Sequence, residues 1–289
     1  MLKALIKTMR LRQWTKNGFV FFGLIFDKQL FLWGPLLRTL EGFALFCLIS
    51  SAVYLLNDIA DVEADRNHPE KKFRPIASGK LPINVALIAA FLLTFISIPL
   101  GYLLSPIFAL FLTLYLLTNL LYSRWLKHVS ILDVLIVSSG FVLRVAAGVA
   151  LITVERFSPW LYMITVLFSL YIGFGKRRAE MSLLADGASS HRKVFEGYTI
   201  HLLDQFITIV SGMTIVAYSL YTFSAPNLPA NHTMMLTIPF VVYGIFRYLQ
   251  LIQMGHAAGS PDEVALKDRP LQMTVLLWGL AVIAVFYLS

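Results

Sequence analysis

The segment that decides the fold runs from Leu40 to Asp65 and reads LEGFALFCLISSAVYLLNDIADVEAD. Its first part is apolar for nearly the length of about 20 residues that an α-helix needs to cross a bilayer. Its last part carries an amide and several carboxylates. The segment therefore predicts a membrane-spanning helix that ends in an anionic cluster at the membrane surface.

The whole chain shares the apolar character of this segment. Of its 289 residues, 58% are hydrophobic and 14% are charged, whereas a soluble domain is about 45–50% apolar and about 25% charged. A water-soluble fold could not bury this much apolar surface. The composition predicts an all-α, polytopic membrane protein that forms a single integral membrane domain over residues 1–289.

Nine apolar stretches are long enough to be candidate spans. The first is the weakest, because Asp27 and Lys28 interrupt it, and the basic segment before it is predicted to be an interfacial helix. The nine stretches are 17–37, 40–60, 83–103, 106–123, 130–152, 158–175, 201–223, 232–253 and 271–288.

Basic residues are distributed unevenly around these spans. With the N-terminus inside, 19 of the 24 Lys and Arg residues fall in cytoplasmic segments, and Lys28, Arg38 and Arg156 fall in outer ones. This bias predicts cytoplasmic loops of positive charge. The net charge of +8 then reflects topology and anionic lipid, and no nucleic-acid motif is present. The long polar loops predicted to be cytoplasmic are 61–82, 176–200 and 254–270.

The acidic end of the second span is the strongest local signal for chemistry. Asn57, Asp61 and Asp65 are four residues apart, and Asp58 precedes Asp61 by three, so on a helix they lie on one face. Carboxylates that repel one another favour a bound cation, and oxygen ligands suit Mg²⁺. The alternative is a solvated acidic helix end, which would oppose the helix dipole.

A basic loop follows the acidic residues. It contains Lys71 and Arg74, with Pro75 and Gly79 to shape it. Cationic side chains next to a carboxylate–metal site are suited to a diphosphate. The same charges are also expected of any cytoplasmic loop, so composition alone leaves both readings open.

Together the two segments, NDxxDxxxD over 57–65 and HPxKxxRPIASG over 68–79, resemble the UbiA superfamily of intramembrane prenyltransferases. The resemblance covers nearly the whole chain. It implies a UbiA-type bundle of about nine helices with cytoplasmic active-site loops. It also implies that Asn57, Asp58, Asp61 and Asp65 bind Mg²⁺ and a substrate diphosphate.

The chain departs from the usual family pattern after its sixth span. A second acidic motif, DxxxD, is expected there, but residues 175–180 read GKRRAE. This departure is similar to one branch of the family, the polyprenyl-phosphate (decaprenyl-phosphate) phosphoribosyltransferases, although a further topology-determining loop also explains the basic residues. Other stretches similar to that branch are Arg12–Asn17, Ser51–Asp58, Leu132–Val134, Leu143–Gly148, Ser260–Val264 and Lys267–Pro270.

The resemblance implies Mg²⁺-dependent transfer of a 5-phosphoribosyl group from 5-phosphoribosyl diphosphate (PRPP) to a polyprenyl phosphate, with release of diphosphate. Asp58, Asp61 and Asp65 are the expected catalytic residues. The acceptor phosphate is already ionised near neutral pH, so no general base is required. The residues expected to bind substrate are Lys16, Asn17, Asn57, Lys71, Arg74, Lys127, Arg144, Lys176, Arg177, Glu180 and Tyr198.

Two charges lie inside the fifth predicted span. Arg144 follows Asp133 by eleven residues, about three turns along nearly the same helix face. Arg144 in hydrocarbon needs a partner, which is either a substrate or a structural ion pair or hydrogen bond. Cys47 is expected to be a small buried hydrophobe, and His191 and His201 show no metal-ligand spacing.

Two other functions are compatible with parts of the sequence. A true prenyltransferase, moving a prenyl group from a prenyl diphosphate to an aromatic or lipid acceptor, shares the fold and first motif. A transporter would also place charges in spans, but the chain shows no internal repeat. The sequence predicts the bacterial cell (inner) membrane and leaves acceptor length and a homo-oligomeric state open.

Overall fold

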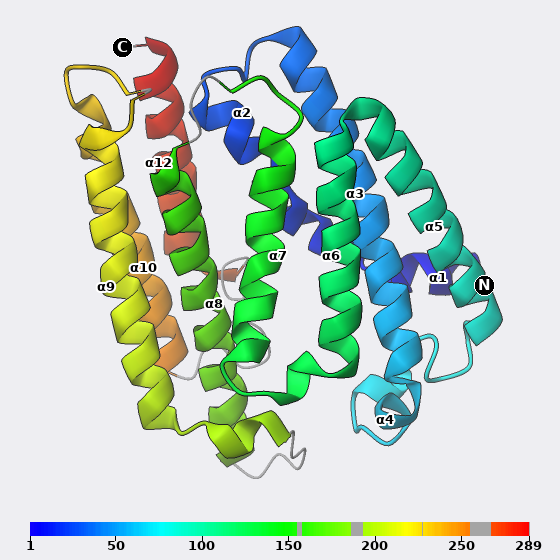
Figure 1. Ribbon diagram of the computed structural model, residues 1–289. Helices are drawn as coiled ribbons and strands as arrows, with labels where there is room; N and C mark the ends of the chain where they lie inside the picture. The colour runs from blue at the N-terminus through cyan, green and yellow to red at the C-terminus, as the bar shows by residue number, and fades with distance from the viewer. Residues whose placement is uncertain (155–157, 186–192, 227, 255–266, 289) are drawn as a thin grey trace. The chain divides into compact units, whose positions relative to one another are not determined.

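A computed structural model describes residues 1–154, 158–185, 193–226, 228–254 and 267–288. In this part of the chain every regular element is an α-helix or a 3-10 helix (η), and there is no strand. The all-helical prediction is therefore confirmed for the described residues (Figure 1).

The chain divides into two compact units. Unit 1 comprises Met1–Lys127 and Ser139–Val154, and unit 2 comprises His128–Ser138 and Glu155–Ser289. Helix α7, Leu132–Val149, begins in unit 2 and ends in unit 1. The expectation of a single domain over residues 1–289 stays a prediction.

Unit 1 is built around α3, which packs against α5 and α6 (Figure 1). Phe46 and Ile49 of α3 are fully buried with Phe108 and Leu112 of α6. Ser105 starts α6 by accepting a hydrogen bond from the Phe108 backbone N–H. Before α7 the elements are α1 (Leu2–Thr8), η1 (Leu11–Phe21), α2 (Phe22–Phe26), α3 (Trp33–Ala60), α4 (Val62–Arg66), η2 (Lys71–Phe73), α5 (Ile83–Leu104), α6 (Pro106–Arg124) and η3 (Leu126–His128).

Unit 2 is a bundle in which α8 packs against α9, and α10 against α12 (Figure 1). Tyr171, Leu203 and Ile207 are fully buried in its core. Asp268 accepts from the Leu271 N–H at the start of α12 and pairs with Arg247 of α10, which lowers the pKa of the Asp268 carboxyl. The elements after α7 are α8 (Pro159–Ala185), η4 (Lys193–Gly197), α9 (Ile200–Ser224), η5 (Thr233–Thr237), α10 (Ile238–Gln253) and α12 (Arg269–Leu288).

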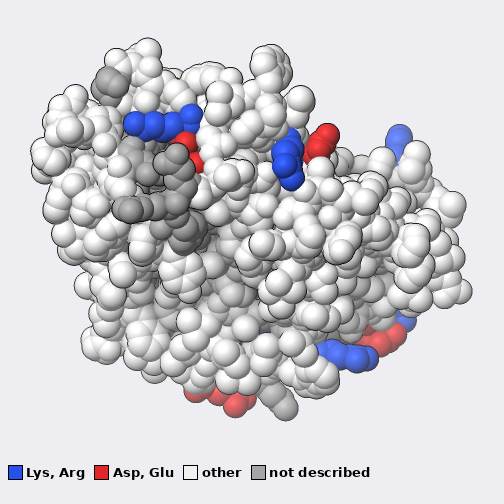
Figure 2. All heavy atoms as spheres, turned by 45° about the horizontal axis from the view of Figure 1, so that its top comes forward, with Lys and Arg blue, Asp and Glu red and all other residues white. Residues whose placement is uncertain are grey.

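Seven helical segments among the described residues are long and apolar enough to cross a membrane. Their outer faces are apolar: only 17% of the most apolar window of α5 is buried within the protein, so lipid must cover the rest. On the face in Figure 2, charged side chains are few among uncharged ones. The seven are Trp33–Ala60, Ile83–Leu104, Pro106–Arg124, Leu132–Val149, Ile200–Ser224, Thr233–Gln253 and Arg269–Leu288.

The predicted span over 17–37 needs correction. The structure divides it into the end of η1, the short helix α2, a turn with Lys28 at φ 57°, and the first residues of α3. Helix α3 accordingly starts at Trp33, seven residues before the predicted span at 40. The count of nine spans is not reproduced by the seven segments. Helix α8 matches the predicted span over 158–175 in position, but its last third carries the charges from Lys176 to Glu180.

The close packing of α7 on η1 gives a test of the fold. A Cβ added to Gly148 would lie 1.9 Å from the Val20 carbonyl oxygen, whereas one added to Gly212 meets nothing within 4 Å. We expect Gly148→Ala to lower stability by about 1–3 kcal/mol, as overpacking does. Gly212→Ala should be neutral or stabilising, because alanine favours a helix. Thermal unfolding in detergent measures both, and equal stability of the two variants would contradict this packing.

Candidate active site

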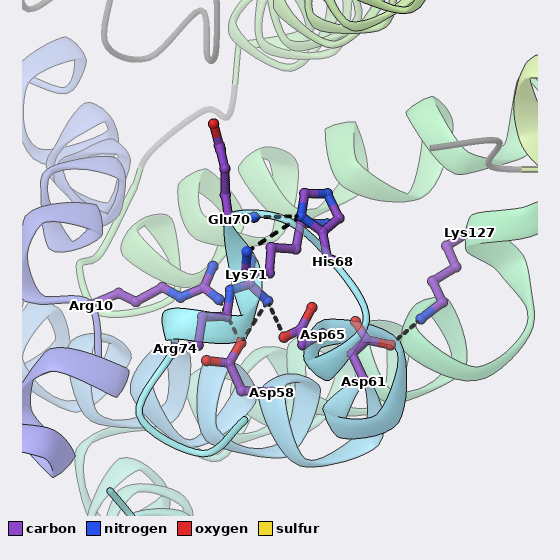
Figure 3. Close-up of polar contacts among 9 residues, drawn as sticks. All are labelled: Arg10, Asp58, Asp61, Asp65, His68, Glu70, Lys71, Arg74 and Lys127. Atoms are coloured by element: carbon purple, nitrogen blue, oxygen red, sulfur yellow. Dashed lines mark hydrogen bonds and ion pairs between the residues drawn. The ribbon is translucent and has the colours of Figure 1, made fainter. Parts of the chain in front are cut away.

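The acidic end of α3 is not a continuous helix. Helix α3 ends at Ala60, Asp61 has φ −95° and ψ 7°, and α4 begins at Val62. The prediction that all the acidic residues lie on one face of one helix is therefore corrected. In Figure 3 the Asp61 carboxylate pairs with Lys127, whereas those of Asp58 and Asp65 both meet Arg74.

Asp58 and Asp65 share one guanidinium. Arg74 Nη1 lies 2.7 Å from Asp65 Oδ2 and 3.3 Å from Asp58 Oδ1. Both carboxylates are buried, with side-chain exposures of 4% and 5%. The basic loop therefore folds back onto the acidic motif, and its arginine offsets the repulsion between two buried carboxylates.

Asp61 has a separate cationic partner. Lys127 Nζ lies 2.6 Å from Asp61 Oδ1. Lys127 belongs to η3, which follows α6, so two segments far apart in sequence meet here (Figure 3). Both side chains are partly exposed, at 24% for Lys127 and 35% for Asp61, so this pair is accessible from outside the protein.

Arg10 also belongs to this cluster, although the sequence did not single it out. Its Nη2 lies 2.5 Å from Asp58 Oδ1, and its guanidinium lies 4.9 Å from the centroid of the Tyr54 ring. In the sequence Arg10 is one of five basic residues before Gly18. The positive-inside pattern accounts for all five equally, so only the tertiary contact distinguishes Arg10.

A histidine shapes the basic loop. His68 Nδ1 accepts hydrogen bonds from the backbone N–H groups of Glu70, at 3.2 Å, and Lys71, at 3.3 Å (Figure 3). Desolvation and the nearby Lys71 charge lower the pKa of His68. The neutral imidazole, which can accept at Nδ1, is therefore the form present at neutral pH.

The second half of the loop is anchored in unit 1. Gly79 has φ 76°, where glycine is favoured, and Leu81 N–H donates to the Pro75 carbonyl. Ile76 and Leu81 are buried against α3 and α5. These contacts hold Arg74, immediately before Pro75, next to the carboxylates.

The donor set of this cluster fits a hard divalent cation. Its possible ligands are all oxygens, which Mg²⁺ prefers. The buried Asn57 Oδ1 has no hydrogen-bond partner among the described residues, which leaves it available as a ligand. No three His, Cys, Asp or Glu side chains in the described ranges already form a metal site, because Asp58, Asp61 and Asp65 pair with Arg10, Arg74 and Lys127.

A second polar cluster lies inside unit 2. Arg177 donates to Asp133 at 2.5 Å and to Glu180 at 2.6 Å. Tyr198 O–H donates to Asp133 at 2.7 Å and accepts from the Ile131 N–H. Burial, and then the bond to Asp133, raise the pKa of Tyr198. The cluster joins α7, α8 and the segment before α9.

Arg178, the next residue of the basic cluster, pairs with Asp204 of α9 at 2.6 Å. Two of the three cations in Lys176–Arg178 thus neutralise carboxylates within unit 2. The sequence had suggested that these cations are there for substrate phosphates. Arg177 and Arg178 instead form ion pairs between helices of unit 2. Substrate binding by Lys176, Arg177, Glu180 and Tyr198 stays a prediction.

Asp133 and Arg144 do not pair, although both lie on α7. Asp133 contacts Arg177, whereas Arg144 donates to Asn17 Oδ1 at 2.8 Å and to Tyr115 Oη at 2.9 Å. Arg144 therefore makes hydrogen bonds between helices, one of the partner types that the sequence left open. Substrate contacts of Asn17, Arg144 and the half-buried Lys16 stay predictions.

Some motifs cannot be placed. His191 and the stretch Ser260–Val264 lie outside the described residues. His201 lies in the first turn of α9, where its side chain is exposed and hydrogen-bonds to Gln205. Cys47 is buried, as expected.

Comparison with known proteins identifies the family. A model of the UbiA prenyltransferase family matches residues 18–262. The chain belongs to this family. The UbiA resemblance of the two polar motifs is thereby confirmed, and the match includes both the acidic end of α3 and the basic loop.

Several curated relatives of this UbiA-family chain, from three bacteria, share one name. It is 36% identical to the decaprenyl-phosphate phosphoribosyltransferase of Mycolicibacterium smegmatis, over 100% of this chain and 94% of that protein. It is 35% identical to the protein of the same name from Mycobacterium tuberculosis H37Rv, over 95% and 91%. The Corynebacterium glutamicum protein of that name is also 35% identical, over 99% and 87%.

Solved structures share the UbiA fold. A UbiA homolog from Archaeoglobus fulgidus bound to DMAPP and Mg²⁺ matches with TM-score 0.74 at 14% identity, over 99% of each chain. A structure of digeranylgeranylglyceryl phosphate synthase matches with TM-score 0.71 at 18% identity, over 100% of this chain and 99% of that chain. At these identities the likeness concerns the fold alone.

The buried cluster of unit 2 generates a prediction. Asp133 is fully buried and Arg177 is 5% exposed. Asp133→Asn would remove one of the two carboxylates that pair with Arg177, and we expect a loss of about 3 kcal/mol in the free energy of unfolding. Asp204→Asn is the matched control, because the Asp204 pair is more exposed, at 33% and 13%, and should cost about 1 kcal/mol or less. Similar unfolding midpoints for the two variants would contradict this account.

Proposed function

We propose that this UbiA-family protein transfers the 5-phosphoribosyl group of PRPP to a polyprenyl phosphate and releases diphosphate. The observation that carries the proposal is the 35–36% identity, over nearly the whole chain, to proteins named decaprenyl-phosphate phosphoribosyltransferase. Decaprenyl phosphate is accordingly the proposed acceptor. The replacement of the second acidic motif by GKRRAE also supports a donor other than a prenyl diphosphate.

The acidic end of α3 is the proposed metal site. Asn57, Asp58, Asp61 and Asp65 supply oxygen ligands for Mg²⁺, and the unpartnered Asn57 Oδ1 supports this role. When bound, the metal withdraws charge from the diphosphate and makes it a better leaving group. A relative in fold was solved with Mg²⁺, which supports a divalent cation for the family.

The cations of the cluster have a second role in this proposal. In the structure, Arg10, Arg74 and Lys127 each pair with a carboxylate. If those carboxylates held a metal, the same side chains would be placed to bind phosphate oxygens of the donor, and Lys71 is the further proposed phosphate ligand. Guanidinium groups suit this use, since their fork of donors matches phosphate geometry.

The chemistry needs few further groups. The ribose C1–O bond to the diphosphate breaks, an oxygen of the acceptor phosphate bonds to C1, and the electron pair leaves with diphosphate. The acceptor is already an anion at neutral pH, so no proton needs to be removed by the protein. The cations stabilise the charge that develops on the leaving group.

The membrane supplies the acceptor. Its tail is apolar and is expected to stay in lipid, while its phosphate lies at the membrane surface, next to the acidic end of α3. The bias of 19 against three basic residues supports a cytoplasmic position for this end, in the bacterial cell membrane. Water-soluble PRPP reaches the site from that side. A homo-oligomer stays a prediction.

Asp58→Asn tests the proposal together with a neighbouring control. Asp58 is buried between two guanidinium groups, whereas Glu63 is 78% exposed and pairs with Arg66. We expect Asp58→Asn to reduce Mg²⁺-dependent transfer of ribose label from PRPP into polyprenyl phosphate at least 100-fold. Glu63→Gln should keep the wild-type rate. Wild-type transfer by Asp58→Asn at saturating Mg²⁺ would exclude this carboxylate from the metal site.

A further inference from the structure

Arg144 is a buried cation in unit 1 that the proposed chemistry does not use. It is 5% exposed. Its Nε donates to Asn17 Oδ1 at 2.8 Å, its Nη1 to the Gly140 carbonyl at 2.7 Å, and its Nη2 to Tyr115 Oη at 2.9 Å. One guanidinium thus joins η1, α6 and its own helix α7.

The hydrogen-bond partners of Arg144 among the described residues are all neutral. Its charge is further stabilised by the faces of three aromatic rings, whose centroids lie 4.7 Å (Tyr115), 5.3 Å (Phe46) and 5.6 Å (Phe141) from its Cζ. Removing a cation from water is costly in an apolar bundle. Because no carboxylate in the described part of the chain pairs with Arg144, its neutral partners must stay in place.

Asn17 connects this cation to η1 and α3. It is fully buried, and its Nδ2 donates to Ser50 Oγ at 3.1 Å. Two further contacts hold η1 against the same face of α7: the Phe19 and Phe141 rings pack edge to face at 5.1 Å, and Gly148 adjoins the Val20 carbonyl. Residues 141, 144 and 148 are spaced by three and four, so they share one helix face.

The other end of η1 leads to the acidic cluster. Arg10, which pairs with Asp58, directly precedes η1 and has φ 54°. Trp14 Nε1 donates to Ser51 Oγ at 3.0 Å, and Ser51 Oγ donates to the Met9 carbonyl at 3.2 Å. The segment from Met9 to Asn17 is therefore held along α3, with Arg10 at one end and the Arg144 contact at the other.

We infer that Arg144 is a positioning residue for the transfer reaction, which acts by fixing Asn17 and η1 so that Arg10 is held at the α3 carboxylates. This inference rests on the proposed function and deepens it. It links the stretches Arg12–Asn17 and Leu143–Gly148, which are far apart in sequence, as the two sides of one contact. Lysine cannot replace Arg144, because an ammonium cannot present the planar fork that meets three partners on three segments.

The test compares variants on the two sides of the guanidinium. Arg144→Lys and Asn17→Ala both release η1, and Asn17→Ala keeps the other two partners of Arg144. Tyr115→Phe is the matched control, because it removes a buried hydrogen bond to the same guanidinium from α6 and leaves η1 attached. The readouts are the KM for PRPP, the KM for polyprenyl phosphate and the thermal unfolding midpoint.

We expect Arg144→Lys and Asn17→Ala to raise the PRPP KM about tenfold, the effect of one lost hydrogen bond of ordinary strength, and to leave the acceptor KM unchanged. In an Arg10→Gln background the same substitutions should have little further effect on the PRPP KM, since the guanidinium that η1 positions is already absent. Tyr115→Phe should lower the unfolding midpoint without raising the PRPP KM. An equal rise in PRPP KM in Tyr115→Phe, or full additivity with Arg10→Gln, would overturn the inference.

Amide hydrogen exchange over residues 11–17 provides a readout that does not need turnover. We expect faster exchange in Arg144→Lys and Asn17→Ala than in Tyr115→Phe. Unchanged exchange would refute the positioning role even if the wild type transfers ribose label. A different outcome is faster exchange in the two variants together with no ribose transfer by the wild type. It would refute the proposed function and leave the link from Arg144 to η1 standing.

Discussion

A charge inside a lipid-embedded bundle must find its partner within the protein, because no water is there to solvate it. Three side-chain groups in this chain follow that constraint. Arg144 is held by neutral acceptors and aromatic faces, Arg177 by two carboxylates, and Asp58 by two guanidinium groups. Each group draws together segments that are distant in sequence, so the polar residues determine which apolar helices pack side by side.

The constraint also shapes the candidate active site. The buried carboxylates of Asp58 and Asp65 would repel each other, and the guanidinium groups of Arg10 and Arg74 offset that repulsion. The same cations are suited to a diphosphate. In the proposed site, a metal and phosphates would replace these internal ion pairs, so that no buried charge would be left without a partner. The UbiA family relationship and the names of the relatives agree with this chemistry.

Long apolar runs made most of the fold predictable. The expected spans at 83–103 and 106–123 differ from α5 and α6 by one residue at their ends, because length and hydropathy suffice for a lipid-facing helix. The prediction of a span over 17–37 was wrong because it too relied on length and hydropathy. The stretch is apolar enough, but 3-10 geometry and the turn at Lys28 depend on tertiary contacts that hydropathy does not record.

The site was predictable where a motif is local. Asp58, Asp65 and Arg74 are within 17 residues of one another, and their proximity follows from one helix end and one loop. Arg10 and the break at Asp61 were not predictable, since the first needs a contact across 48 residues and the second a backbone angle. The basic cluster after the sixth span was interpreted from its charge and from the missing acidic motif. Two of the carboxylates that neutralise it, Asp133 and Asp204, come from other helices.

The most direct test of the account uses PRPP labelled at two places, ribose carbon and the β-phosphorus, with purified protein, Mg²⁺ and decaprenyl phosphate in detergent. The account predicts that the ribose label enters the lipid phase while the β-phosphorus label stays in water as diphosphate, because the C1–O bond breaks. Entry of the β-phosphorus label into the lipid with the ribose label left in water, which would mean diphosphoryl transfer, would contradict it. So would a lack of transfer from PRPP alongside transfer from a prenyl diphosphate.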